Sequence, residues 1–253
     1  MSFLKIRQSI LGYLYRYLNK PNQVDFSIED KNIQLLECHL GEARLKHLLT
    51  SVDIKTLIDI GASHGDFMNL VQQAKKNIHI YGFEPIPKVF NSLQQRFVGA
   101  NEIELYNLAL GNFDGVVDFN ENDYSYSSSI LPIGEIHVNE FPHTSNFKKL
   151  EVQITTLDSV FNNKKIERPL LVKVDVQGYE EQVISGGKNT FAHADFVIIE
   201  VSFYELYLGQ ALFERINREL NSLGLFYYGC ISQLSSPIDC KILQQDALFI
   251  RRK

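Results

Sequence analysis

The sequence has few cysteines and no long apolar run. Its 253 residues include three cysteines, Cys38, Cys230 and Cys240, which are odd in number and lack C-x-x-C spacing. Neither a disulfide framework nor a structural zinc site is therefore indicated. No segment approaches the run of about 18 uncharged apolar residues that a transmembrane helix needs. We expect a cytoplasmic protein whose thiols stay reduced.

The chain also lacks an excess of positive charge. Lys and Arg total 25 against 30 Asp and Glu, which gives a net charge of −5. We therefore expect no nucleic-acid partner, because a domain-wide binding surface for nucleic acid is basic. With 45% hydrophobic and 22% charged residues, the composition is typical of a globular chain with one large domain, or one domain with additions.

Residues 1–20 have the pattern of a basic amphipathic helix. Apolar side chains recur near helical spacing at Phe3, Ile6, Ile10, Leu14 and Leu18. Arg16 interrupts the apolar face and no small-residue cleavage site follows, which argues against a signal peptide. Such a helix can pack on the domain, form a homodimer contact or make a peripheral membrane contact; the first two are favoured. Residues 1–50 are predicted to be a helical extension and cap, and residues 51–253 the main domain.

Strand and helix patterns alternate from Thr56 onward. Seven principal strands are predicted at Leu57–Ile60, Ile78–Phe83, Ile103–Leu110, Leu170–Val176, Phe196–Val201, Leu225–Tyr228 and Ala247–Ile250. This order predicts an α/β fold with a seven-stranded, mostly parallel, doubly wound sheet and helices on both faces. The final two strands have no helix between them, so we expect the last strand to run antiparallel.

Residues 120–150 interrupt this alternation with a polar segment. It contains a serine run, two prolines and two histidines, together with Tyr124 and Tyr126. Long irregular segments inside compact domains are usually functional or disordered, and the aromatic residues favour order. We predict a substrate lid in which Tyr124, Ser127, Ser128 and His143 line an acceptor pocket. The alternative is a polar surface that needs no ligand.

A glycine turn follows the first predicted strand. Leu57–Ile60 leads into Gly61-Ala62-Ser63-His64-Gly65, and the next apolar run ends at Glu84. A strand, a tight turn, a helix and a second strand that ends in a carboxylate are typical of a site for an adenosine-containing cofactor. A diphosphate needs a further glycine at position 63, so its absence favours S-adenosylmethionine over NAD.

The same stretch predicts how each part of S-adenosylmethionine is held. Asp59 is expected near the ammonium group, Glu84 on the ribose hydroxyls, and the backbone of residues 107–109 along the adenine. The full predicted cofactor set is Asp59, Gly61, Ala62, Ser63, Gly65, Glu84, Pro85, Asn107, Leu108 and Ala109.

Seven sequence blocks resemble those of the FkbM family of class I S-adenosylmethionine-dependent O-methyltransferases. They occupy residues 57–65, 82–87, 107–111, 128–132, 155–158, 171–180 and 198–203, in the family's order, and begin with Leu-Ile-Asp-Ile-Gly-Ala-Ser-His-Gly. The resemblance implies a Rossmann-like class I fold and O-methylation. The family usually has Asp-x-Glu-Gly in the sixth block, whereas this chain has Asp175-Val176-Gln177-Gly178. A carboxylate role at position 177 is therefore weaker or absent here.

The catalytic candidates follow strands whose carboxyl ends face the ligand in this fold. Asp175 is predicted to act as general base or to orient the acceptor, with Lys173 on the same face of its strand. Glu200 is a second acid suited to sugar hydroxyls, and His137 in the lid is a further candidate base near neutral pH. Asp175 and Glu200 would also serve as oxygen ligands in a metal-dependent variant. No tight carboxylate cluster is evident, so we predict no metal site.

These features predict an O-methyltransferase acting on a sugar hydroxyl of a glycan, glycolipid or sugar-bearing metabolite. The polar lid and the two acids suit a polyol-like acceptor. Two alternatives stay open: a methyltransferase of a non-sugar secondary metabolite, and a cofactor-binding module without turnover. Gln177 is the feature that supports the module, whereas the intact Asp59, Gly61, Glu84 and Asp175 oppose it.

Overall fold

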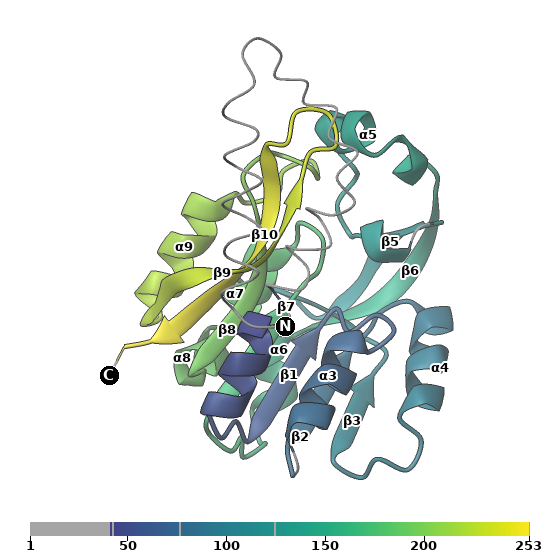
Figure 1. Ribbon diagram of the computed structural model, residues 1–253. Coiled ribbons are helices and arrows are strands. Elements are labelled where there is room, and N and C mark those ends of the chain that lie inside the picture. The colour runs from purple at the N-terminus through teal and green to yellow at the C-terminus, as the bar shows by residue number, and fades with distance from the viewer. Residues whose placement is uncertain (1–40, 42, 76, 124, 253) are drawn as a thin grey trace, which may run out of the picture.

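The computed structural model describes residues 41, 43–75, 77–123 and 125–252 (Figure 1). The predicted helix at residues 1–20, Cys38 and Tyr124 lie outside the described residues. Within them, neither Cys230 nor Cys240 takes part in a disulfide. No helix in this described part is long and apolar enough to cross a bilayer.

Seven strands form the central sheet in the order β3-β2-β1-β7-β8-β10-β9 (Figure 1). They are β1 (Thr56–Ile60), β2 (His79–Phe83), β3 (Ile103–Tyr106), β7 (Leu170–Val174), β8 (Phe196–Ser202), β9 (Leu225–Ser235) and β10 (Ile242–Arg251). Neighbouring strands are parallel except where β10 pairs with β8 and β9. This confirms the predicted α/β fold with a seven-stranded, mostly parallel, Rossmann-like sheet and an antiparallel last strand.

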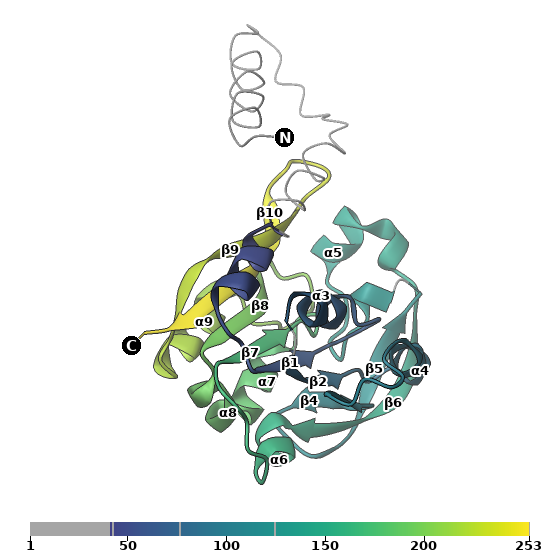
Figure 2. The ribbon, with the colours of Figure 1, turned by 60° about the horizontal axis from the view of Figure 1, so that its bottom comes forward.

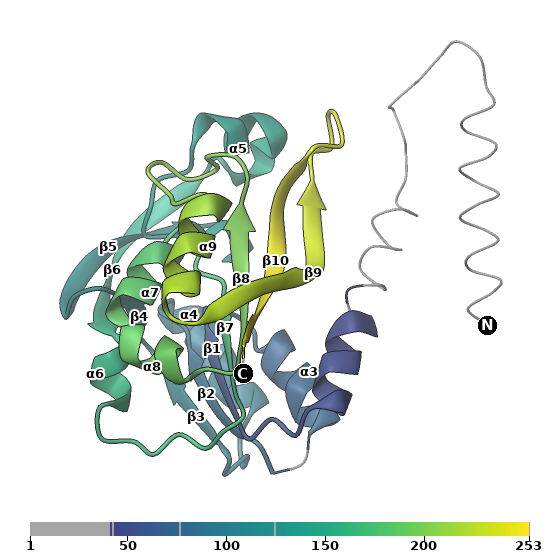
Figure 3. The ribbon, with the colours of Figure 1, turned by 90° about the vertical axis from the view of Figure 1, so that its left-hand side faces the viewer.

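Helices cover both faces of the sheet because its inner strands are apolar on both sides. Leu57 packs in one core with α3 (Asp66–Ala74), α4 (Pro87–Arg96) and the helical residues 43–51. Ile58 and Ile60 pack in the other core with α6 (Leu157–Phe161), α7 (Glu180–Gly186), α8 (Lys188–His193) and α9 (Phe213–Ser222). Figure 3 shows α7, α8 and α9 on one side of the sheet and α3 on the other.

Several elements differ from the sequence prediction. Ile103–Leu110 is not one strand, because it breaks at Asn107 and Leu108 and continues as β4 (Ala109–Gly111) in a second sheet. The hairpin strands β9 and β10 are much longer than predicted, since the residues near their turn are largely polar and carry no apolar strand signal. The helix α8 has no counterpart in the prediction, because its six residues are too few to show periodicity.

A second, three-stranded sheet carries the segment predicted as a lid. Its order is β4-β6-β5, and β5 (Gly115–Asn122) runs antiparallel to β6 (Phe147–Thr156). Between these strands lie η1 (Ser125–Ser127), α5 (Glu135–Glu140) and η2 (Pro142–Thr144). The small sheet lies beside β2 and α4 (Figure 2), where Phe119 and Val152 pack with Val89. Residues 120–150 are therefore two strand ends that carry a short helical insert, rather than one loop.

The insert is joined to the tip of the C-terminal hairpin. The buried carboxylate of Glu140 on α5 accepts a hydrogen bond from Ser236 Oγ at 2.6 Å and pairs with Lys241 Nζ at 2.9 Å. Ser236 directly follows β9, and Lys241 directly precedes β10. The contact links two parts of the chain across the carboxyl end of the central sheet (Figure 1).

A close backbone contact sets the glycine turn after β1. Gly61 has a φ of +80°, and a β-carbon there would lie 1.9 Å from the carbonyl oxygen of Asp175. The N–H groups of Gly61 and Ala62 donate to Phe83 O at 3.0 and 2.8 Å, and Asp175 N–H donates to Ile60 O at 2.9 Å. The ends of β1, β2 and β7 are thereby held together with no room for a side chain at position 61.

We expect Gly61→Ala to destabilise the protein by about 3 kcal/mol or more, because the new side chain adds a backbone clash to left-handed strain. Gly99→Ala is the matched control. Gly99 has a φ of +83°, but a β-carbon there meets nothing within 4 Å, so a loss of only about 1–2 kcal/mol is expected. Urea unfolding measures both variants. Equal losses would show that the contact with Asp175 does not constrain the turn.

Candidate active site

A cavity of about 460 Å³ opens at the carboxyl ends of β1, β2, β7 and β8. This volume lies in the range of small-molecule sites. The sequence-predicted residues on its wall are Gly61, Ser63, Glu84, Pro85, Leu108, Ala109, Ser127, Ser128, His137, His143, Asp175 and Glu200. The fold thus brings residues of the glycine turn, the insert and the two acid-bearing strands to one space.

Other predicted residues lie behind this wall: Asp59, Ala62, Gly65, Asn107 and Lys173. Gly65 has a φ of +80°, and its lack of a side chain lets the turn pack closely on α4. Asn107 Nδ2 donates to the backbone oxygens of Glu84 and Pro85, at 2.8 and 2.9 Å. It therefore ties the segment after β3 to the segment after β2 and supports the wall.

Glu84 presents a buried carboxylate to the cavity. Its Oε1 accepts a hydrogen bond from Ile86 N–H at 2.8 Å, and its Oε2 accepts one from Ser63 N–H at 3.0 Å. Burial raises the pKa of this carboxyl to about 7, although the two N–H groups oppose the shift. Each carboxylate oxygen keeps a lone pair that can accept a ligand hydroxyl.

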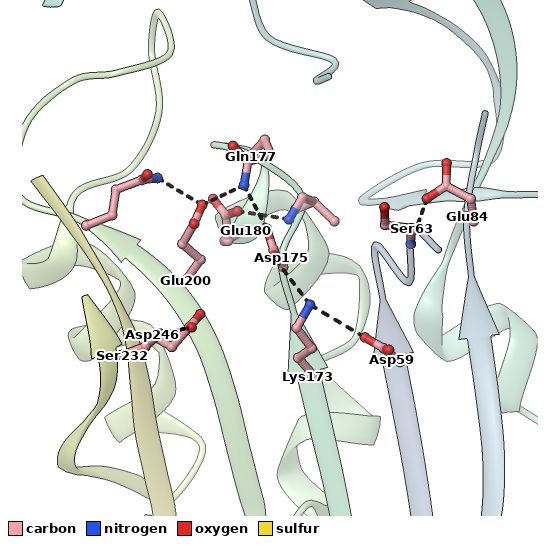
Figure 4. A network of polar contacts seen from close by, with 12 residues as sticks. Asp59, Ser63, Glu84, Lys173, Asp175, Gln177, Glu180, Glu200, Ser232 and Asp246 are labelled. Atoms are coloured by element: carbon pink, nitrogen blue, oxygen red, sulfur yellow. Dashed lines mark hydrogen bonds and ion pairs between the residues drawn. The ribbon is translucent and has the colours of Figure 1, made fainter. Parts of the chain in front are cut away.

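Lys173 lies between two acids at the ends of β1 and β7 (Figure 4). Its Nζ is 3.1 Å from Asp175 Oδ2 and 3.8 Å from Asp59 Oδ1. Burial alone lowers the pKa of Lys173, but the carboxylates of Asp175, Asp59 and Asp246 outweigh it and raise the pKa above its ordinary value. The ammonium is therefore charged at neutral pH and holds one oxygen of Asp175.

Asp59, which is predicted near the ammonium of the cofactor, does not line the cavity. Its side chain is fully buried, and its carboxylate oxygens have no hydrogen-bond partner among the described residues. Burial raises the pKa of Asp59 to about 6, against the opposing effect of Lys173. The cavity wall at this point consists of Gly61 and Ser63, so Asp59 balances the charge of Lys173 behind it.

Glu200 and Asp175 are linked through the side-chain amide of Gln177 (Figure 4). Gln177 Nε2 donates to Asp175 Oδ1 at 2.8 Å and to Glu200 Oε2 at 2.9 Å. Gln244 Nε2 donates to the same oxygen of Glu200 at 2.8 Å. Burial, reinforced by the charge of Asp175, raises the pKa of Glu200 well above its usual range. The two predicted acids therefore line one shared part of the cavity.

His137 on α5 is buried at the cavity wall against the rings of Phe141 and Tyr207. Burial, with a smaller effect of His143, lowers the pKa of His137 to about 4. The imidazole is therefore neutral at pH 7, because the protonated form loses its solvation inside the protein. The lowered pKa makes His137 a weaker base than an ordinary histidine, and its role as a base stays a prediction.

Comparison with known proteins identifies the family. The model of the methyltransferase FkbM domain matches residues 59–227. The chain belongs to the FkbM methyltransferase family. One relative of this chain is the 2-O-methyltransferase NoeI of Sinorhizobium fredii, which is 27% identical to it over 161 residues. The match covers 61% of this chain and 66% of NoeI, so this chain spans about two thirds of that relative's length.

Solved methyltransferase structures are similar to this FkbM chain at low sequence identity. Magnesium protoporphyrin IX methyltransferase (ChlM) from Synechocystis PCC 6803, with bound SAH, has a TM-score of 0.48 and 11% identity, and the match covers 98% of both chains. The N-methyltransferase NodS from Bradyrhizobium japonicum WM9, in complex with S-adenosyl-L-homocysteine, has a TM-score of 0.47 and 15% identity. That match covers 96% of this chain and 98% of NodS.

The predicted cofactor, S-adenosylmethionine, is confirmed by membership of the FkbM family, and the residues present fit it. Gly61 leaves the backbone bare at the cavity, and Glu84 offers a buried carboxylate whose lone pairs suit ribose hydroxyls. Gly61, Ser63, Glu84, Leu108 and Ala109 would hold the cofactor. When bound, S-adenosylmethionine supplies an activated methyl group. Across the described ranges, no three His, Cys, Asp or Glu side chains gather as a metal site.

The sequence prediction misses three polar residues of the FkbM site: Glu180, Tyr207 and Gln244. The Glu180 carboxylate accepts hydrogen bonds from Val176 N–H at 3.2 Å and Gly178 N–H at 3.1 Å, which shapes the turn after β7. Glu180 is the last residue of the sixth block that resembles the FkbM family, so this block could have indicated it. Tyr207 and Gln244 have no local signal, because they reach the site only through tertiary contacts.

We expect S-adenosylmethionine binding to depend on ionised Glu84. A carboxylate that accepts two hydroxyls must first lose its proton, so affinity should rise about tenfold from pH 6 to pH 8, across the pKa of about 7. Glu84→Gln should weaken binding at pH 8 by about tenfold or more, because it removes a charged acceptor. It should also remove most of the pH dependence. Calorimetric titration at both pH values measures these effects.

Glu104→Gln is the matched control for this measurement. Glu104 lies on the neighbouring strand β3 and pairs with Lys164 at 2.5 Å, away from the cavity. This variant should bind the cofactor like the wild type at pH 6 and pH 8. A Glu84→Gln variant that keeps the tenfold pH dependence would contradict the assignment of Glu84.

Proposed function

We propose that the protein is an O-methyltransferase that transfers a methyl group to a hydroxyl of a sugar in a glycan, glycolipid or sugar-bearing metabolite. The observation that carries this proposal is the pair of carboxylates, Asp175 and Glu200, on the wall of one cavity. Two close carboxylates suit the neighbouring hydroxyls of a sugar ring, because each accepts strong hydrogen bonds from O–H groups. The name of the relative NoeI, a 2-O-methyltransferase, supports transfer to oxygen.

Polar residues of the insert would contact the rest of the acceptor. Ser127, Ser128 and His143 line the same cavity as the two acids. Ser128 Oγ also accepts a hydrogen bond from Asn122 N–H at 2.9 Å, which fixes the end of β5 against this polar segment. In this proposal residues 120–150 act as the substrate lid, with α5 and η2 over the acceptor.

Asp175 is the proposed general base. Lys173 Nζ lies 3.1 Å from one of its oxygens, and Gln177 Nε2 lies 2.8 Å from the other. Both oxygens are thereby oriented before an acceptor arrives, and each keeps a lone pair for a hydroxyl proton. Removing that proton from the attacking hydroxyl contributes about 10²–10⁴-fold in typical enzymes. Glu200 would hold a second hydroxyl of the same sugar.

In this proposal Gln177, the feature that favours a binding module without turnover, belongs to the network of the two acids. Its amide completes a hydrogen-bond network with both acids, so the glutamine is integrated into the site. Apolar alcohols, used as acceptors beside sugars, distinguish the non-sugar alternative.

We expect Asp175→Asn to lower methyl transfer by about 100-fold or more, because the amide cannot take the hydroxyl proton. Its affinity for S-adenosylmethionine should change by less than about threefold. Asp246→Asn is the matched control, since Asp246 is a carboxyl near Lys173 that lies off the cavity wall. It should retain transfer within about threefold.

The assay uses S-adenosylmethionine with a labelled methyl group and three acceptor sets: oligosaccharides, sugar nucleotides and apolar alcohols. Labelled sugar products are expected. Transfer to apolar alcohols alone would contradict the proposed acceptor class, and full turnover by Asp175→Asn would remove Asp175 from the mechanism.

A further inference from the structure

Gln177 uses its whole side-chain amide within the site. Its nitrogen carries two N–H groups, and they serve the two acids, Asp175 at 2.8 Å and Glu200 at 2.9 Å. Its oxygen Oε1 accepts a hydrogen bond from the Tyr207 hydroxyl at 2.7 Å. One amide therefore spans the acids of two neighbouring strands and a tyrosine from the segment after β8.

Tyr207 fixes which way this amide points. The ring of Tyr207 is fully buried, and its edge packs against His137 of the insert. A flipped amide would place its oxygen against both carboxylates and lose its favourable contacts. The observed orientation, with the nitrogen toward Asp175 and Glu200, is thus the one that satisfies all three partners.

The backbone also aims Gln177 at the acids. Gln177 has a φ of +57°, a left-handed conformation that is costly for a residue with a side chain. Such conformations persist where the surroundings enforce them. Here Ser129 Oγ donates to the carbonyl oxygen of Gln177 at 2.6 Å, and a β-carbon on Gly178 would lie 2.8 Å from Tyr207. The residue is therefore held from both the insert and the segment after β8.

The charges around Asp175 and Glu200 favour a neutral hydrogen-bond donor over a carboxylate at position 177. The titratable groups that interact with the pair are Asp59 on β1, Glu84 after β2, Lys173 on β7, Glu180 on α7, Asp246 on β10 and Tyr207 after β8, and His137 and His143 line the same cavity. A carboxylate in place of the Gln177 amide would add like charge beside Asp175 and Glu200 and remove a donor from each. Like charges this close disfavour joint ionisation.

We propose that Gln177 is a positioning residue whose amide fixes the separation and direction of the Asp175 and Glu200 carboxylates, so that both face one acceptor. This inference rests on the proposed function for its kinetic consequence. Gln177 acts through the two acids and does not itself exchange a proton with the acceptor. The neutral bridge lets the acid pair work at a lower pH than a third carboxylate would allow.

The kinetic test compares Gln177→Glu with the wild type in sugar methylation from pH 5 to pH 9. The midpoint of the acid limb of kcat/KM should move up by about one pH unit or more, and kcat should fall by about tenfold. Gln245→Glu is the matched control, because Gln245 is a buried glutamine on β10 that lies off the cavity wall. Its midpoint should stay at the wild-type pH. An unshifted midpoint for Gln177→Glu would overturn the proposal.

A second readout needs no turnover. Thermal unfolding of the cofactor-free protein is followed from pH 5 to pH 8 for Gln177→Glu, Glu200→Gln and the double variant. A half-buried carboxyl beside two other carboxylates binds more protons in the folded than in the unfolded state, so Gln177→Glu should lose stability as the pH rises. If residue 177 interacts with Glu200, the loss of stability that Gln177→Glu causes as the pH rises should be smaller by at least about half in the Glu200→Gln background.

An extra loss that is equal in both backgrounds would overturn the positioning role of Gln177, whatever the activity. A wild-type protein that methylates no sugar would instead contradict the proposed function, and the unfolding comparison would still decide the role of Gln177.

Discussion

The buried ammonium of Lys173 is the interaction on which the carboxyl end of the sheet depends. Removing a charge from water costs several kcal/mol unless partners offset it, and here Asp175 and Asp59 stand at 3.1 and 3.8 Å. Without Lys173, Asp59 would be a buried carboxylate with no partner among the described residues. Asp175 would keep only the hydrogen bond from Gln177 on its side chain. The geometry of the acid pair thus begins with one lysine.

Strand register explains why this ion pair forms. Asp59 on β1 lies directly opposite Lys173 on β7 in the parallel pairing of the two strands. Directly opposed residues of neighbouring strands place their side chains on the same face of a sheet, so the two charges meet. The pairing also brings Gly61 against the backbone of Asp175. The glycine turn and Asp175 therefore lie at the same end of one parallel strand pair.

The parts of this arrangement that were predictable are those with a local signal. The fold and the turn follow from apolar runs that end at Gly61 and Glu84, and Asp175 and Glu200 follow from their places after strands. The depth of a side chain has no such signal. Packing buries Asp59 behind the wall and gives His137 a pKa far from neutral. Gln177 could be noticed only as a departure from the family pattern, because its partners come from three distant segments.

The contact between Gly61 and the carbonyl of Asp175 also limits which parts of the site can move independently. A β-carbon at Gly61 would lie 1.9 Å from the carbonyl oxygen of Asp175, so the backbones of the glycine turn and of Asp175 touch, and neither can shift without moving the other. The insert between β5 and β6 and the β9–β10 hairpin are joined to each other through Glu140 and Lys241, outside this strand pair. A shift of these two segments would therefore reshape the side of the cavity that Ser127, Ser128 and Gln244 line, while Gly61 and Asp175 stay together.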